Sequence, residues 1–504
     1  MMTMKKYIFA LSAIIVLLSS CGKDFVTVKH NSSEPMDEYF ISQERMYQSL
    51  VAAYDSLNWL DYFDQYVNAL TLTPDVMADD IYAGGSNEGD QPSIVKTHYY
   101  TLTSTEQLDR IWTICYSGVN RSCIVLEYVD RVPGMDEALK NRYIAEATVL
   151  KAFYYNIMWK YWGNIPYYDK NLTAPYITKQ LKADEVYAKC VENLENVFEM
   201  DALPMKAAAG EEGRVTKAMA YMLYAEMVMY QNDTERYPQA LAYMEEIINS
   251  GQYALVADFA GMWLESGEWG TESIWEINYT SEGAPRSWGS PLTTGGTVYP
   301  MLIGIPGATE ASGFSDGWGF GPVAKHAYDM YAEDDIRRDG GILHYNSVFD
   351  DPIPEDKWRW QGTGYYLLKY VARRNGNHGQ IADGDMNHCN NVRVYRYAET
   401  LLNAAELSVL TGKDGSQYLQ QVRNRANCKD TGSDQAAIIA ERRKEFLGEG
   451  KRYWDLVRTG MAETVLAAGT HEWRTQGWHS GKKYWPLPQS EVDKDPNLVQ
   501  NVGY

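Results

Sequence analysis

Apolar residues recur at intervals of three and four over much of this chain, which is the period of an amphipathic α-helix. The clearest run is 139–162, which Gly163 can end. The run 218–225 is apolar almost all round, which indicates a buried helix, and Thr216 could cap it. The pattern predicts helices over the ranges 36–60, 106–130, 139–162, 183–199, 216–231, 236–250, 394–409 and 435–447.

The pattern changes between residues 251 and 391. The stretch 283–321 holds ten glycines, and seven of the fifteen tryptophans fall between Trp263 and Trp360. Glycine and proline at this density predict irregular loops, and loops of this length are uncommon without a function. A short β-like piece is expected at 364–371. Trp358 and Trp360 alternate around Arg359, so one of them is expected to be exposed.

These patterns predict a mainly α fold with a few short strands. Helices of about 15 residues separated by short turns suggest tetratricopeptide-like pairs, although the repeat consensus itself matches poorly. We expect one domain over 37–504. Its helical scaffold would cover about 37–250 and 392–504, and a loop-rich aromatic insertion would cover about 251–391.

The N-terminus has the features of an export signal. Lys5 and Lys6 form a basic head, and residues 7–18 form an apolar core too short to span a bilayer. Cys21 follows Ser20 where cleavage is expected, which resembles the lipobox of a bacterial lipoprotein. This predicts a signal peptide at 1–20, a lipidated Cys21 and a tether at 21–36. An ordinary secretory signal is the alternative.

The formal net charge of −21 argues against nucleic acid as a partner, because phosphate binding depends on Lys and Arg. Apart from Cys21, five cysteines remain and none forms a CxxC motif. Cys115 and Cys123 would lie about 12 Å apart along one helix, too far for a disulfide. We expect buried free thiols, with no metal cluster and no cofactor.

No motif in the sequence indicates catalysis. HExxH and P-loop patterns are lacking. Residues 383–387 (DGDMN) look like the start of a calcium loop, but His388 and Val394 stand where such a loop needs glycine and an acid. We therefore expect a solvated turn there and a non-catalytic binding protein.

Five segments of the chain, taken in order, resemble the SusD/RagB family of Bacteroidetes surface lipoproteins. They are 146–155 (EATVLKAFYY) with 162–166 (WGNIP), 213–218 (GRVTKA), 392–402 (VRVYRYAETLL), 441–446 (ERRKEF) with 449–456 (EGKRYWDL), and 484–492 (YWPLPQSEV) with 497–504. The resemblance covers nearly the whole mature chain and agrees with the lipobox. The last segment has Pro486-Leu487-Pro488 where the family often has Pro-Ile-Pro, a conservative change.

The resemblance implies a helical fold with four tetratricopeptide-type helix pairs and an irregular, ligand-facing part. It implies a lipoprotein of the outer membrane that faces the cell exterior and binds a nutrient, usually a glycan. The implied partner is a SusC-like TonB-dependent transporter, on which the lipoprotein sits as a lid. The matched segments are mostly scaffold, so they carry over no ligand residue.

Two stretches have the composition of a sugar site, in which aromatic faces stack on the sugar and polar side chains bond its hydroxyls. They are 75–89 and 285–321. The predicted ligand-binding residues are Asp79, Asp80, Tyr82, Arg286, Trp288, Tyr299, Asp316 and Trp318. For each aromatic residue, packing inside a loop is the alternative.

The leading hypothesis is a surface protein that captures oligosaccharides or polysaccharides and delivers them to the transporter. Two alternatives stay open. One is a peptide-capturing relative, which would need a groove lined by backbone donors. The other is a mainly structural lid with little affinity for a ligand of its own.

Overall fold

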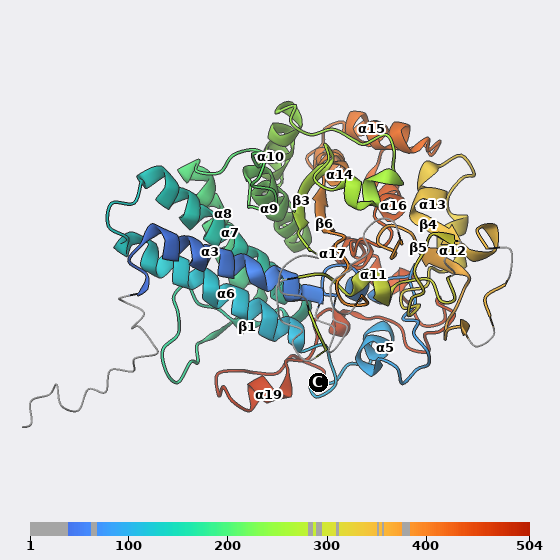
Figure 1. The fold of residues 1–504 in the computed structure, drawn as a ribbon, viewed down its shortest axis with the longest axis horizontal. Coiled ribbons are helices and arrows are strands. Elements are labelled where there is room, and N and C mark those ends of the chain that lie inside the picture. The colour runs from blue at the N-terminus through green and yellow to red at the C-terminus, as the bar shows by residue number, and fades with distance from the viewer. Residues whose placement is uncertain are drawn as a thin grey trace, which may run out of the picture.

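A computed structural model describes residues 39–61, 68–280, 286–288, 295–308, 312–349, 352–354, 357–374 and 384–504. The chain is mainly helical (Figure 1). Cys21 and the predicted leader and tether lie outside the described residues, as do Asp383 of the expected calcium-like turn and the predicted helix start at residue 36. No helix in the described ranges has the length and apolar content needed to cross a bilayer.

An array of long helices fills one half of the molecule, and each packs on its neighbour in the order α3, α6, α7, α8, α9, α10, α14 (Figure 1). The helices and their bounds are α3 (Gln43–Asn58), α4 (Leu72–Met77), α5 (Pro92–His98), α6 (Arg110–Tyr128), α7 (Glu137–Trp162), α8 (Ala183–Met200), α9 (Lys217–Gln231), α10 (Tyr237–Asn249), α11 (Tyr299–Leu302), α12 (Lys325–Asp329), α13 (Ile336–Gly341), α14 (Tyr397–Leu410), α15 (Ser416–Ala426), α16 (Gln435–Glu445), α17 (Arg452–Arg458), α18 (Ala462–Val465) and α19 (Gln489–Val492).

A side-chain cap fixes the start of each of the two central helices, α7 and α9. The Asp136 carboxylate accepts from the Leu139 amide at 3.0 Å at the start of α7, and Gly163 follows its last residue with φ +68°. Thr216 caps α9 as predicted, since its hydroxyl accepts from the Met219 amide at 3.1 Å. Nearly every residue of α9 is buried, which explains why its apolar residues are not confined to one face.

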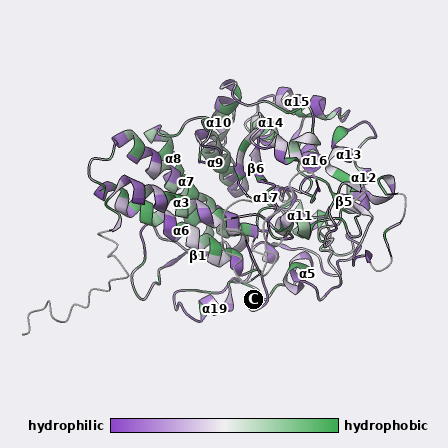
Figure 2. Ribbon diagram, in the orientation of Figure 1, coloured by the Kyte–Doolittle hydropathy of each residue, from purple (hydrophilic) through white to green (hydrophobic). Residues whose placement is uncertain are grey.

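The outer helices have one solvated face. Hydrophobic and hydrophilic residues alternate along α3 and α6 in Figure 2, as expected for helices that pack on the array with one side only. Within α6, Gly118 faces α7 so closely that an added Cβ would lie 2.3 Å from the Tyr154 ring. A glycine is therefore what lets these two helices approach.

Three short antiparallel pairs of strands complete the fold. β1 (Ile165–Pro166) pairs with β2 (Gln180–Leu181), β3 (Ser273–Ile277) with β6 (Val392–Arg396), and β4 (Ile342–His344) with β5 (Tyr365–Leu367). The strand expected within 364–371 is thus confirmed as β5. The helix predicted from Val394 begins only at Tyr397, because residues 392–396 pair with β3 and are buried on both faces.

A buried ion network joins the loop-rich middle of the chain to the C-terminal helices. Arg396 of β6 contacts Glu445 at 3.1 Å and Glu449 at 2.8 Å, and Lys369 also pairs with Glu449. Arg337 of α13 contacts Glu445 at 3.1 Å. All five side chains are almost fully buried, so each charge depends on its partners inside the protein.

The five cysteines of the described residues are buried free thiols, which confirms the prediction from their spacing. Burial raises the pKa of each thiol, to about 12 for Cys123, Cys190 and Cys389. The pKa of Cys115 and that of Cys428 are also raised by burial. A thiol with so high a pKa is a poor nucleophile, so these side chains act as small apolar groups.

Candidate ligand-binding face

The two stretches predicted to contact a ligand lie side by side. Residues 81–85 run antiparallel to residues 319–323, with bridges between Ile81 and Val323 and between Gly84 and Phe320. The Gly85 amide donates to the Gly319 carbonyl at 3.2 Å, and the Gly321 amide donates to the Ala83 carbonyl at 3.0 Å. Segments more than 200 residues apart in the sequence therefore build one surface.

Glycine makes this close approach of two backbones possible. Gly84 has φ +71°, and a Cβ there would lie 2.5 Å from the Gly319 carbonyl oxygen. A third segment joins the first two, because the Trp360 amide donates to the Gly85 carbonyl at 3.0 Å. The glycine-rich composition thus reflects three chain segments packed backbone to backbone.

Trp288 and Trp318 form a stacked pair at this surface. Their ring centroids lie 6.1 Å apart and their planes are inclined by 28°. Trp288 is 49% exposed, whereas Trp318 is half-buried against Val298 and Met386. The Trp318 amide donates to the Met301 carbonyl at 3.0 Å, which holds the second ring in place. The pair therefore offers a supported aromatic face to solvent.

Asp316 lies near this pair and is half-exposed. Its carboxylate accepts from the Gly307 amide at 2.7 Å and contacts the Lys357 Nζ at 3.0 Å. Oδ1 of Asp316 thus stabilises a turn of the loop, and Oδ2 forms an ion pair with Lys357, which is partly exposed. Such a pair can exchange hydrogen bonds with a hydroxyl-rich ligand at its solvent side.

Asp79 and Asp80 are buried and paired with arginines of the C-terminal helices. Asp79 contacts Arg452 at 2.9 Å. Arg443 donates to both carboxylate oxygens of Asp80 through its Nε and Nη2, and His326 lies 3.4 Å from Asp80. Burial opposes the charge on Asp80, but Arg443 and His326 outweigh it and lower the pKa of this carboxyl well below its usual range. Both aspartates anchor the early segment to the scaffold.

Tyr82, Arg286 and Tyr299 are also buried. The Tyr82 ring packs edge-on against His471 at 4.7 Å, and burial raises the pKa of Tyr82 to about 12. Arg286 pairs with Asp61 at 2.7 Å, and the Tyr299 ring lies 5.4 Å from that of Tyr370. Tyr82 and Tyr299 belong to the buried apolar cluster against which Trp318 packs.

Further aromatic residues stand at the same end of the molecule. Trp358 is exposed, as expected for one of the two tryptophans around Arg359, and Trp360 is half-buried. Trp360 lies 6.5 Å from Tyr99 and 6.3 Å from Trp473, ring centre to ring centre. The sequence analysis missed Tyr99 and Trp473, because only the fold brings their distant segments next to Trp360.

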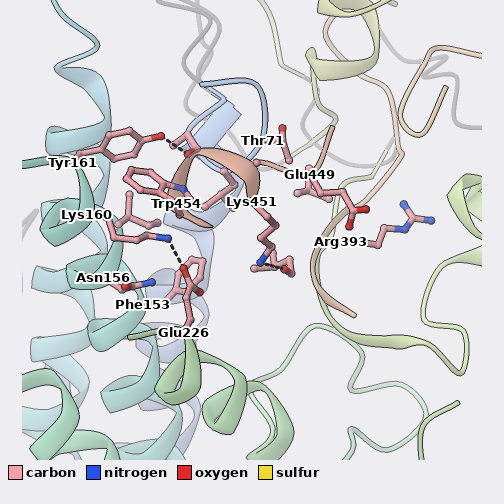
Figure 3. A pocket seen from close by; sticks show the side chains of 16 residues that line it. Thr71, Phe153, Asn156, Lys160, Tyr161, Glu226, Arg393, Glu449, Lys451 and Trp454 are labelled. Atoms are coloured by element: carbon pink, nitrogen blue, oxygen red, sulfur yellow. Dashed lines mark hydrogen bonds and ion pairs between the residues drawn. The ribbon is translucent and has the colours of Figure 1, made fainter. Parts of the chain in front are cut away.

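The family-like segments meet at a cavity that is too small for a sugar. It measures about 40 Å³ and is lined by residues of 153–161, 392–394 and 449–454 (Figure 3). In Figure 3 Lys160 points towards Glu226, with which it forms an ion pair. Burial opposes the charge on Glu226, but Lys160 and Lys451 lower its pKa to about 2. Such a volume suits one or two waters, so these segments are scaffold.

Cys428, Asp430 and Glu441 are the only group in the described residues with the spacing of a metal site. Both carboxylates already have cationic partners. Asp430 pairs with Lys444 at 2.7 Å, and Glu441 pairs with Arg423 at 2.9 Å. The group is therefore an ion-pair cluster beside a buried thiol.

Comparison with known proteins identifies the fold. A model of the SusD family matches residues 345–504. The surface glycan-binding protein A of Bacteroides thetaiotaomicron, solved in complex with laminarihexaose, is 43% identical, with a TM-score of 0.86 over 91% of this chain and 99% of that one. The corresponding protein of Bacteroides fluxus is 36% identical, with a TM-score of 0.85 over 92% of this chain and 100% of that one.

A laminarin-binding SusD-like protein is 27% identical and has a TM-score of 0.82, covering 92% of this chain and 100% of that one. The fold, the order of the matched segments and the identity to these relatives agree over almost the full length. The chain belongs to the SusD family.

Proposed function

We propose that this protein captures a neutral glycan at the cell surface and passes it to a transporter. The observation that carries the proposal is the stacked pair Trp288 and Trp318, whose outer ring is half-exposed. A sugar has an apolar C–H face that packs on an aromatic ring, and the hydroxyls around it need polar partners. As a SusD family member the protein binds its ligand and is not an enzyme.

The relatives narrow the class of glycan. The protein that is 43% identical was solved with laminarihexaose, and another relative is described as laminarin-binding. We therefore propose a laminarin-type oligosaccharide as the ligand. Trp288 and Trp318 would stack on it and Asp316 would bond its hydroxyls. Five buried side chains would support this surface from beneath, namely Asp79, Asp80, Tyr82, Arg286 and Tyr299.

The cellular setting follows from the N-terminal sequence and the family. Acylation of Cys21 would anchor the protein in the outer membrane, and residues 21–36 would act as a tether. A SusC-like TonB-dependent barrel would receive the glycan, with this protein as its lid. Mass spectrometry of the N-terminal peptide from the native membrane tests the acylation, and co-purification with the barrel tests the partnership.

Affinity electrophoresis of the soluble chain, residues 22–504, in gels that contain laminarin tests glycan binding. We expect retardation of the wild-type protein and its loss in Trp288→Ala/Trp318→Ala, with affinity reduced at least tenfold since stacking is worth about 1.5 kcal/mol or more for two rings. The matched control is Tyr47→Ala, which changes an exposed aromatic residue on α3 outside the candidate face. Equal retardation of the double variant and the wild type would contradict the proposed site.

The same gels separate the alternatives that the sequence left open. Retardation by another polysaccharide and not by laminarin would keep the function and change the ligand. If no polysaccharide retards the protein, a panel of peptides tests the peptide-capturing alternative. Normal uptake by cells carrying the double variant would favour a mainly structural lid.

A further inference from the structure

A groove of about 770 Å³ lies between the start of α6, the connection from β1 to β2, and α19. Its lining residues are far in sequence from the tryptophan pair. Figure 1 places these three elements together at the lower part of the molecule. None of its lining residues belongs to 75–89 or 285–321. The volume falls within the range of small-molecule sites, which is about 300–1,000 Å³.

One wall of the groove is aromatic. Trp112, Tyr116 and Asn120 line it at intervals of four residues along α6. The ring of Tyr116 is nearly parallel to that of Tyr168, with centroids 6.1 Å apart and an interplanar angle of 16°. The Tyr116 hydroxyl donates to the Pro166 carbonyl at 2.7 Å, so the ring is fixed in orientation.

Tyr176 stands at the rim and is 71% exposed, although large aromatic side chains are usually covered. Its backbone adopts φ +62°, a region that residues other than glycine and asparagine seldom occupy. The Tyr176 amide donates to the Thr173 carbonyl at 2.8 Å, which closes the turn that presents the ring. The turn thus displays an aromatic ring beside the groove.

The polar residues of the groove favour an uncharged, hydroxyl-rich ligand. Oδ1 of Asp109 is buried and has no hydrogen-bond partner among the described residues. A ligand hydroxyl in the groove supplies a donor to the Asp109 carboxylate, which lines it. The charged lining residues are Asp109, Arg110, Glu491, Lys494 and Asp495. Three acids and two bases leave a net charge of only −1, and Lys494 already pairs with Glu491 at 2.8 Å.

We propose that this groove is a second saccharide-binding site, which holds another stretch of the same glycan. The faces of Tyr116, Tyr168 and Tyr176 stack on sugar rings, and Asp109 accepts from a sugar hydroxyl. The class of ligand rests on the proposed function, but the site itself uses different residues. Two separated contacts on one polysaccharide raise its affinity by making the second contact intramolecular.

Hydroxyl-radical footprinting of residues 22–504 with laminarihexaose as the probe reports on each site separately. We expect oxidation of Tyr176 to slow by about threefold at saturating sugar, because a groove of this kind covers most of the ligand surface and the lining with it. Tyr47 on α3 is 45% exposed and does not line the groove, so its oxidation is the internal control. Trp288 reports on the first site in the same sample.

Each outcome decides between the two proposals. Protection of Tyr176 supports the groove, with or without protection of Trp288, and protection of Tyr176 alone would overturn only the tryptophan site. No protection of Tyr176 by millimolar laminarihexaose overturns the groove, whatever happens at Trp288. Protection of Tyr176 by the assembled transporter and not by the sugar would assign the groove to a protein interface and overturn the inference.

Variants provide a second measurement. Tyr176→Ala and Asp109→Ala change residues at the rim and the start of α6, so they leave the core intact. We expect each to weaken retardation in laminarin gels by about fivefold, the value of one hydrogen bond or ring contact. Tyr47→Ala is the matched control and should match the wild type. Retardation equal to wild type in both groove variants would count against the proposal.

Discussion

At the scale of single residues, aspartate has two different roles in this protein. Asp316 lies half-exposed beside the tryptophan pair, whereas Asp79 and Asp80 lie buried against arginines. The sequence indicates which residue types a sugar site needs, but burial decides which of them reach solvent. An aspartate that pairs with an arginine over 360 residues away is indistinguishable, in sequence, from one that faces a ligand.

His471 gives a residue-scale prediction about pH. Burial and the nearby Arg474 lower the pKa of His471 to about 3, whereas an unfolded histidine titrates near 6.5. The unfolded chain therefore binds this proton first, so its contribution to stability is complete above about pH 6.5 and is lost as the pH falls towards 3. Within that window, each pH unit costs about 1.4 kcal/mol.

The change His471→Phe keeps a ring against Tyr82 and removes the proton. We expect the free energy of unfolding, measured with urea at pH 7.5, 6 and 5, to fall less steeply in this variant than in the wild type. His479→Phe, at an exposed position, is the control and should keep the wild-type slope. An unchanged slope in His471→Phe would show that this histidine does not set the pH dependence.

At the scale of elements, helical periodicity predicted the array well and its ends less well. The helices around α7 and α9 were confirmed because their apolar patterns and caps are local properties of the chain. Residues 394–396 of strand β6 were wrongly predicted as helix, since the pairing of β6 with β3, over 100 residues earlier, does not affect the local pattern. The same limit hid Tyr99 and Trp473 beside Trp360.

The contact between α6 and α7 gives an element-scale prediction. In Gly118→Ala the new Cβ would meet the Tyr154 ring at 2.3 Å, so the helices must separate. We expect a loss of about 1–3 kcal/mol in the free energy of unfolding, as for other overpacked cores. Asn120→Ala, on the exposed side of the same helix, is the control and should be neutral or slightly stabilising. A Gly118→Ala protein as stable as wild type would mean that Tyr154 moves aside freely.

At the scale of the whole molecule, buried charges connect parts that the sequence separates. Arg396, Glu445 and Glu449 link β6 to the C-terminal helices, and Arg337 and Lys369 extend the link into the loop-rich part. The predicted boundaries at 250 and 392 mark where helical periodicity in the sequence gives way to glycine-rich loops and then returns. The network connects the helical scaffold to the loop-rich part, which favours the expectation of one domain over 37–504.

One cooperative unfolding transition is therefore expected in calorimetry of residues 22–504. Arg396→Met should move that whole transition to lower temperature, because it leaves buried carboxylates without a partner, at a cost of about 3–5 kcal/mol. Lys325→Met removes an exposed ion pair with Asp329 and should change little. A loop-rich part that melts separately in the wild type would contradict the prediction of one domain.

The buried cysteines have a practical consequence. Every thiol in the described part of residues 22–504 is covered and has a raised pKa, so maleimide dyes would leave the folded protein unlabelled. A cysteine introduced at an exposed position such as Tyr176 or Trp358 would then be the one reactive site. The chain thus already provides a background free of reactive thiols, on which a single dye can report the movements of one molecule at a time.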